Sequence, residues 1–370
     1  MEKAYKFRIY PTKEQERMFQ ENFGCVRFVY NYYLGMRIDK YRKDKSDMRY
    51  NQCSANLTQL KKSLIWLQNA DSTSLQTALR NLDNAFLNFF SNKKFGYPKF
   101  KSKRKSKKSF TTKSASIKIV DSYINLPKVK LVKCKFSRKV EGKILNATVS
   151  QSKSGKYYVS LCCRIEDIPQ FEPAHKNVGI DLGLKDFLIT SDSEKFDNQK
   201  FLLKSEKLLK RVQKKFSKSK TSGKNHGKLR IKLAKRYEKV SNQRKDYLHK
   251  LSAMLIKRYD IICLESLKVQ NMIKNHRLAK SIQDVSWSEF VRMLQYKANW
   301  YGKCIQRVDT YYPSSQLCSC CEYQNTAIKD LSIRNWTCPN CNATHDRDIN
   351  ASINILNQGL KLLNAQITIR

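Results

Sequence analysis

Four cysteines in two C-x2-C pairs constrain this chain more than any other feature of its sequence. Cys318 and Cys321 are followed, after sixteen residues, by Cys338 and Cys341. Paired thiolates at this spacing allow two tight turns to present four sulfurs tetrahedrally to Zn²⁺. Four protein ligands leave no open position on the metal, so we expect a structural zinc. Cys320 stands between two of these ligands and is the alternative to Cys321.

The charge of the chain indicates a polyanionic partner. Its 370 residues include 73 Lys and Arg against 31 Asp and Glu, a formal net charge of +42 that is spread along nearly the whole length. A Lys-rich surface can serve solubility alone, but solubility needs only a small net charge and usually mixes signs. Binding to a polyanion is therefore the favoured interpretation.

The sequence has no segment suited to a membrane or to export. No run approaches the roughly 18 apolar residues that a membrane-spanning helix needs, and the opening MEKAYKFRIYPTKEQ lacks an apolar core. We therefore expect no membrane partner and a cytoplasmic location. The twelve cysteines of such a chain are expected to be reduced thiols or metal ligands rather than disulfides.

The first part of the chain predicts one strand followed by helices. Residues 3–10 alternate as a strand, and Thr12 with Gln15 forms a capping-box pair that starts a helix. Two more helices are expected at residues 51–67 and 72–90. The last of these has an apolar stripe, which predicts that one face lies in a core.

A basic run, FKSKRKSKKSF, follows the helices from Phe100 to Phe110. Such a run is usually a solvated loop, but in a chain this basic we favour contact with phosphates. Its candidate residues are Lys101, Lys103 and Arg104. Residues 116–166 are β-rich, so the helices are predicted to be an insertion in a β-unit.

The second half of the sequence predicts an α/β domain. NVGID at residues 177–181 and IICLE at 261–265 are each typical of a buried strand that ends in an acid. Another strand is expected at 187–191, followed by a long basic helical hairpin. A later helix is expected to start with a capping box of Ser286 and Glu289. Alternating strands and helices are typical of the α/β class.

Three acids are the candidate catalytic residues. Asp181 and Glu265 end the two apolar strands, where a charge is costly unless it faces a cleft or a cation. Asp348 lies in HDRDIN, soon after the second cysteine pair. Singly, each acid is more often structural, as a turn residue or a helix N-cap. Together they suit phosphodiester cleavage, in which carboxylates bridge cations about 3.5–4 Å apart. Such oxygen ligands favour Mg²⁺ or Mn²⁺.

Several stretches together resemble the TnpB proteins of IS200/IS605-type bacterial insertion sequences, also called OrfB, which are similar to miniature type V CRISPR effectors and to Fanzor proteins. The matching stretches occur in family order along the chain: FRIYPTKEQ, LQTALRNLDNAFLNFF, GYPKFKSK, VGIDLGLKDF, IICLESL, SSQLCSCC, WTCPNC and HDRDINASINI. By this resemblance, Asp181, Glu265 and Asp348 fall on the three metal-binding acids of the family. Asp348 is preferred to Asp346 because it precedes the x-N-A part of the motif.

The resemblance implies a multidomain α+β fold. Residues 1–11 and 113–172 would form a β-barrel wedge domain, into which a helical recognition lobe of residues 12–112 is inserted. Residues 173–317 and 343–370 would form an α/β RuvC-like nuclease of RNase H fold, with a zinc ribbon inserted at 318–342.

Two positions in the cysteine motif depart from the family pattern. Glu322 and Asn342 stand where a glycine usually follows each C-x2-C pair. Asn tolerates a left-handed backbone fairly well, whereas Glu tolerates it poorly. The residue types therefore leave the exact fold of the first turn open.

The resemblance also implies partners. A transposon-derived guide RNA pairs with a double-stranded DNA target, while the protein reads only a short adjacent motif and holds the heteroduplex by its backbone. In the family this DNA motif is read by the helical lobe and wedge. The candidate residues for reading it here are Tyr50, Ser54, Thr73 and Gln76. We expect one protein per RNA, and association with the nucleoid when DNA is bound.

The expected function is therefore an RNA-guided DNA endonuclease of an insertion sequence that uses two metal ions for hydrolysis. The alternative is a nuclease-inactive, RNA-guided DNA-binding repressor of the same fold. A transposase that performs strand transfer itself is a third possibility. Presence of all three acids favours the endonuclease over the repressor.

Overall fold

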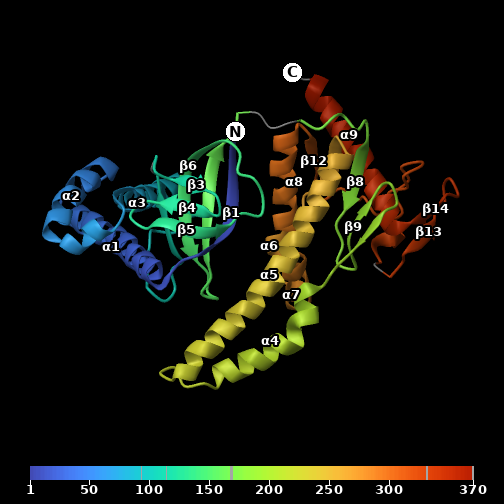
Figure 1. Ribbon diagram of the computed structural model, residues 1–370. Helices are drawn as coiled ribbons and strands as arrows, with labels where there is room; N and C mark the ends of the chain where they lie inside the picture. Colours follow the sequence, from blue (N-terminus) through green and yellow to red (C-terminus); the bar gives the residue numbers. More distant parts are fainter. Residues whose placement is uncertain (93, 114, 167–169, 331, 369–370) are drawn as a thin grey trace. The chain divides into compact units, whose positions relative to one another are not determined.

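The computed structural model describes residues 1–92, 94–113, 115–166, 170–330 and 332–368. The chain divides into two units, Met1–Asp167 and Ile168–Arg370 (Figure 1). Within the described ranges, no helix combines the length and apolar character needed to cross a membrane.

The helices of the first unit begin directly after its first strand. Strand β1 (Glu2–Tyr10) leads into α1 (Lys13–Asp44). The Thr12 side chain accepts the Gln15 backbone N–H, and the Gln15 side chain accepts the Thr12 N–H, so the predicted capping box is confirmed. The helical segments that follow are α2 (Tyr50–Ser63), the 3₁₀ turn η1 (Ile65–Asn69) and α3 (Ser72–Ser91).

These helices share a buried core, so the apolar stripe predicted for residues 72–90 is indeed a core face. Arg37 of α1 lies beside this core with only 3% of its surface exposed. Its guanidinium donates to both Asp47 and Asp83, which balance the buried charge. The core contains, among others, Tyr33, Leu34, Leu57, Leu67, Leu75, Leu79 and Leu82.

Seven antiparallel strands form the sheet of the first unit, in the order β2-β6-β7-β1-β5-β4-β3. Strand β1 pairs with both β5 and β7, although the helices separate it from them in sequence. The predicted insertion of helices into a β-unit is thus confirmed. The remaining strands are β2 (Lys108–Thr112), β3 (Lys118–Val120), β4 (Tyr123–Leu126), β5 (Lys130–Lys135), β6 (Lys143–Gln151) and β7 (Tyr157–Arg164).

One boundary differs from the expected division of the chain. The expected helical lobe ends at residue 112, but residues 108–112 form β2 and pair with β6. The local sequence is lysine-rich on both sides of this point, so composition does not mark where the strand begins. Strands β2 and β3 stand at the two ends of the sheet order, and closure into a wedge barrel stays a prediction.

A five-stranded mixed sheet organises the second unit, in the order β10-β9-β8-β11-β12. Strands β8, β11 and β12 are parallel, while β9 and β10 are antiparallel to their neighbours. The predicted α/β character of this half is confirmed. The strands are β8 (Asn177–Asp181), β9 (Asp186–Thr190), β10 (Lys195–Asp197), β11 (Ile261–Glu265) and β12 (Cys304–Val308).

The predicted helical hairpin consists of α4 (Phe201–Ser217) and α5 (Lys224–Arg258), and its tip lies far from the five-stranded sheet in Figure 1. After β11 come α6 (Val269–Met272), α7 (His276–Val285) and α8 (Trp287–Tyr301). The cysteine region contains η2 (Thr326–Lys329), β13 (Asn335–Thr337) and β14 (Thr344–Asp346). Helix α9 (Arg347–Thr368) follows it.

Helix α8 begins where the sequence predicts, but without the predicted capping box. Ser286 adopts a left-handed conformation (φ 59°), and its hydroxyl donates to the carbonyl of Gln283 instead of capping α8. The reason is that Ser286 also ends α7, so one residue serves both helices. Its position at the C-terminal end of α7 determines its backbone conformation.

Candidate functional site

Two of the three acids are brought together by parallel strand pairing. Ile180 of β8 is in register with Leu264 of β11, and the next residue of each strand is an acid, Asp181 and Glu265. Because the strands are parallel, both acids stand at the same edge of the sheet. The apolar residues before them are fully buried, which fixes the strands and leaves the acids at the end of the core.

Helix α9 brings the third acid to this edge. A side chain at Gly179 of β8 would overlap the backbone of Ser352 and Leu356, and one at Gly359 would overlap Cys263 of β11. These two glycines therefore allow α9 to lie directly on the strands that end in Asp181 and Glu265 (Figure 1). Asp348 is in the first turn of this helix.

The three carboxyls influence one another electrostatically. Burial, together with the charges of Glu265 and Asp348, raises the pKa of Asp181 to about 7, while the nearby Arg347 opposes the shift. Burial also raises the pKa of Glu265, against a hydrogen bond from Ser314 that favours the charged form. Ionising all three acids is thus unfavourable without a compensating positive charge.

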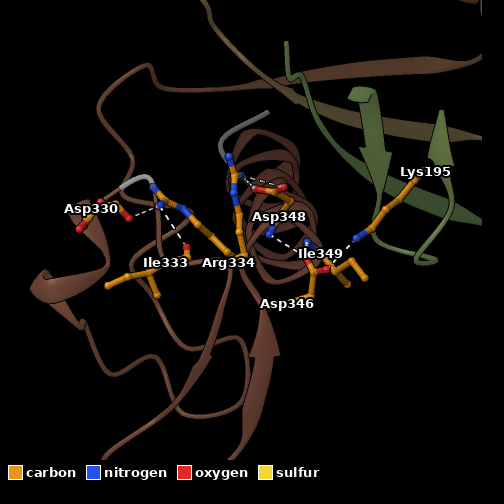
Figure 2. Close-up of polar contacts among 8 residues, drawn as sticks. Lys195, Asp330, Ile333, Arg334, Asp346, Asp348 and Ile349 are labelled. Atoms are coloured by element: carbon orange, nitrogen blue, oxygen red, sulfur yellow. Dashed lines mark hydrogen bonds and ion pairs between the residues drawn. The ribbon is translucent and has the colours of Figure 1, made fainter. Parts of the chain in front are cut away.

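Neighbouring polar groups hold two of the acids. The Ser314 hydroxyl donates to Glu265 Oε1 over 2.6 Å. Arg334 forms an ion pair with Asp348 (Figure 2). Its Nη1 lies 3.2 Å from Asp348 Oδ2 and 3.3 Å from Oδ1. Arg334 precedes β13, so a residue of the cysteine region supplies the counter-charge of the third acid.

The neighbouring acid, Asp346, has a different role. Its Oδ1 accepts the backbone N–H groups of Asp348 and Ile349, and its Oδ2 is 2.7 Å from the Lys195 ammonium (Figure 2). Asp346 therefore caps the start of α9 and is neutralised by β10. These contacts support the choice of Asp348 as the third acid of the candidate site.

The three acids do not form a closed ligand set in this conformation. Among the described residues, groups whose ligand atoms all lie within 4.8 Å of one another come only from the cysteine region. The Asp348 carboxylate is instead paired with Arg334. All donors of the acidic site are carboxylate oxygens, which fits Mg²⁺ or Mn²⁺.

The four predicted cysteines do come together. The sulfurs of Cys318, Cys321, Cys338 and Cys341 all lie within 4.8 Å of one another, and two of their pairs are 3.6 Å apart. A tetrahedral zinc with bonds of about 2.3 Å separates its sulfurs by roughly 3.8 Å. The cluster therefore fits a structural zinc.

Cys320 is excluded from this set of four. It is exposed and forms a separate group with Cys318 and His345. His345 Nε2 lies 3.1 Å from Cys318 Sγ, and its ring packs on Trp336. The structure thus favours Cys321 over Cys320 as the fourth sulfur of the cluster. It also places His345 within hydrogen-bonding distance of the cluster.

Both cysteine turns close in the same way, despite the missing glycines. Glu322 (φ 60°) and Asn342 (φ 58°) are both left-handed, and their N–H groups donate to the carbonyls of Cys318 and Cys338, each over 2.9 Å. The first turn therefore has the same backbone conformation as the second, although Glu322 is the less favourable residue for it. Lys361 of α9 pairs with Glu322 at 2.6 Å, a contact that accompanies the less favourable residue.

The candidate contacts in the helical part differ in accessibility. Gln76, Lys103 and Arg104 are exposed, Ser54 is partly exposed, and Tyr50 lies under the guanidinium of Arg80. These positions are open to a ligand.

Thr73 and Lys101 are engaged within the protein. The Thr73 hydroxyl bonds to Asp71 and Thr112 and accepts the N–H of Lys113, so it links α3 to β2. The Lys101 ammonium lies 3.6 Å from the centre of the Tyr30 ring, and burial lowers its pKa. Both residues have structural contacts that their sequence context did not predict.

The sequence analysis did not single out four residues of the site: Ser314, Arg334, His345 and Arg347. Ser314 is 49 residues from Glu265, and Arg334 is 14 residues from Asp348. His345 and Arg347 flank Asp346 within HDRDIN, and Ser314 is the first residue of SSQLCSCC, so these two motifs were the available signals.

Three family models match successive parts of the chain. Residues 1–46 match a model described as "Helix-turn-helix domain", although the structure has a strand and one long helix there. Residues 160–276 match the OrfB model of IS605 elements, described as "Probable transposase". Residues 287–355 match "Cas12f1-like, TNB domain".

Two curated relatives align with nearly the whole chain, and both are provisionally named RNA-guided DNA endonuclease. A protein of Streptomyces pristinaespiralis is 37% identical over 97% of this chain and 90% of its own length. InsQ of Escherichia coli K12 is 30% identical over 97% of this chain and 93% of its own. A solved complex of Cas12f1 with sgRNA and target DNA aligns with 96% of this chain and 99% of its own at 15% identity, with a TM-score of 0.38.

The fold and site define a protein of mixed helices and sheets with an inserted four-cysteine cluster of the zinc-binding type. Given relatives that match from end to end, the chain belongs to the TnpB family, also called OrfB, of insertion-sequence proteins, and it is a nuclease of that family.

Proposed function

We propose that this protein is a transposon-associated, RNA-guided endonuclease that cleaves double-stranded DNA beside a short adjacent motif. The observation that carries the proposal is the meeting of Asp181 and Glu265 at one sheet edge, under the first turn of the helix that holds Asp348. The guide RNA and the DNA target are carried over from the names of the relatives. The net charge of +42 suits both partners.

Asp181, Glu265 and Asp348 would hold the divalent cations of the nuclease site. The pKa of Asp181 supports this, because it is raised first by burial and then by the charges of Glu265 and Asp348, and a cation beside these carboxylates would relieve both costs. Bound Mg²⁺ would supply activation of water and neutralisation of the developing phosphate charge. We assign this chemistry to a RuvC-like domain in the second unit.

The residues around the acids have separate tasks in this proposal. Ser314 orients Glu265 through its short hydrogen bond. Arg334 balances Asp348 while no cation is bound, and it is half-exposed, so it can leave the carboxylate without unfolding its surroundings. The capping role of Asp346 fixes the first turn of α9 and thereby the position of Asp348.

Binding of the nucleic acids is assigned to the first unit, including its basic run from Phe100 to Phe110. Tyr50, Ser54 and Gln76 are proposed to contact the short adjacent motif, and Lys103 and Arg104 to contact phosphates. Thr73 and Lys101 are proposed to support these contacts indirectly, since they anchor α3 and the basic run.

The Asp181→Ala variant tests the assignment of the site. Purified complex with its guide RNA is incubated with a matched plasmid and Mg²⁺, and both cutting and DNA binding are measured. Losing a direct metal ligand should reduce cutting by about 100-fold or more, while binding stays near the wild-type level. Asp246→Ala removes an exposed acid of α5 and serves as the matched control.

Three results would count against the proposal. Full cutting by Asp181→Ala would reject Asp181 as a site residue. Binding without cutting by the wild-type complex would instead favour the RNA-guided repressor, and joined transposon ends would favour a strand-transferring transposase.

A further inference from the structure

The stretch from Asn84 to Val120 combines aromatic and basic residues without a single acid. It contains eleven Lys or Arg and seven Phe or Tyr, and its flanking acids are Asp83 and Asp121. Uninterrupted positive charge with interspersed aromatics is typical of surfaces that bind nucleic acid strands. The phosphate contacts inferred from the charge of the chain involve only basic residues of this stretch and leave its aromatic residues without a role.

Within this stretch, several large aromatic side chains are exposed. Phe90 is 72% exposed, Phe100 60%, Phe95 53% and Tyr97 44%. Single exposed aromatics are ordinary, but four within eleven residues form a concentration that folding alone does not explain. We call these four residues the aromatic platform.

The base of the platform is rigid. Tyr97 packs edge-on against Phe86 and Phe89, with ring centres 5.5 and 5.3 Å apart. Phe86 is itself buried, and its ring lies 4.0 Å from the guanidinium carbon of Arg37. Arg37 is held by two carboxylates, so the loop is fastened to the core of the helical part.

The far end of the segment is fastened as well. The Asn31 side chain accepts the backbone N–H of Lys101 over 2.7 Å and donates to its carbonyl over 2.9 Å. The Lys101 ammonium rests on the Tyr30 ring. Between these two anchors, Pro98 is buried and fixes its own backbone angle. Tyr97 and Lys101 therefore anchor the chain on both sides of Phe100, which is exposed between them.

We propose that the aromatic platform stacks with the bases of unpaired nucleotides, while the surrounding lysines attract their phosphates. Unpaired bases fit because each offers a flat face without sequence preference, whereas bases inside a duplex are already stacked. The proposal rests on the proposed function in one respect, that the protein works on nucleic acid. The unpaired strand comes either from the bound RNA or from opened DNA.

A comparison of intact and abasic strands tests stacking separately from charge. The full-length protein with its co-purified RNA is titrated with a fluorescent single-stranded oligonucleotide, and with an abasic strand of equal length and charge. The wild-type protein should bind the intact strand about tenfold or more tightly than the abasic one. The double variant Phe90→Ala/Phe100→Ala should lose most of this preference.

Two controls isolate the aromatic contribution. Tyr41→Ala removes an equally exposed aromatic of α1 and should keep the preference. The double variant Lys103→Ala/Lys105→Ala should weaken the binding of the intact and the abasic strand to the same degree, because it removes only positive charge. Unchanged circular dichroism of the aromatic variant shows that it is folded, as its exposed positions predict.

Ultraviolet crosslinking followed by mass spectrometry distinguishes the two sources of the strand. Crosslinks of residues 90–100 to the co-purified RNA assign the platform to the guide, and crosslinks to added DNA assign it to the target. The platform is rejected if wild type shows neither crosslinks nor a preference for intact strands. Plasmid cutting is measured in parallel, so that loss of the platform and loss of the proposed nuclease function are told apart.

Discussion

At the scale of single residues, Lys297 shows how one buried charge influences the scaffold of the candidate site. It lies on α8 with 8% of its surface exposed, and its ammonium donates to the carbonyl of His249 and to the hydroxyl of Ser252 on α5. Burial lowers the pKa of Lys297 from 10.5 to about 8. The folded protein therefore prefers the neutral amine more than the unfolded chain does.

This shift predicts a pH-dependent stability. Between about pH 8 and 10.5 the unfolded chain binds more protons at this lysine, so its contribution to the free energy of unfolding increases with pH and is lost as pH falls through 8. Lys297→Met removes the effect. Urea unfolding should show wild type gaining on the order of 2–3 kcal/mol relative to the variant from pH 7 to pH 10.5. An equal difference at both pH values would contradict the shift.

The residues of the candidate site differ in how far the sequence could predict them. Asp181 and Glu265 were marked by the end of an apolar strand, a local signal, and Asp348 by its motif. Whether Asp348 or Asp346 is the third acid depends on the backbone at the start of α9, where Asp346 is used as a cap. Arg334 and Ser314 come from loops, and only the folded chain brings them to the acids.

At the scale of elements, we expect the four-cysteine region to depend on a bound metal for its folding. Strands β13 and β14 have three residues each, and the core contains little more than Ile328, Trp336 and the buried cysteines. So small a core does not fold without a crosslink. Because Arg334 and the α9 cap adjoin this region, its folding also affects the third acid.

Metal analysis and substitution test this dependence. We predict about one zinc per chain, lost in Cys338→Ser and retained in Cys320→Ser, which changes an exposed cysteine outside the set of four. Chelation should make residues 318–345 sensitive to protease and reduce cutting, while the first unit stays folded. Zinc loss from Cys320→Ser with retention in Cys338→Ser would overturn the ligand assignment.

Elements were predictable where the signal is local. The capping box of Thr12 and Gln15 and the stripe of α3 correspond to helices in the structure. Prediction failed where neighbours compete for one residue, as at Ser286, or where composition is uniform, as at β2. The pairing of β1 with β7 links the two ends of the first unit, and only the β-helix-β order of the sequence hinted at it.

At the scale of the whole molecule, the sequence order alone implied an insertion of helices into the first unit and an α/β second unit, and both are observed. What it could not give is the state of the acidic site, because the Arg334 contact and the mutual influence of the carboxyls arise only from three-dimensional proximity. The positive charge is distributed over both units, so the entire chain is suited to nucleic acid.

Guide-directed cutting is the most direct test of the central claim, that this protein cleaves DNA selected by a bound RNA. Two plasmids that differ only in the sequence matched by the guide are incubated with the purified complex and Mg²⁺, and the guide is then exchanged for one that matches the other plasmid. The account predicts linear product from the matched plasmid alone, with the preference reversed by the exchange. Equal cutting of both plasmids, or cutting that persists without the RNA, would contradict it.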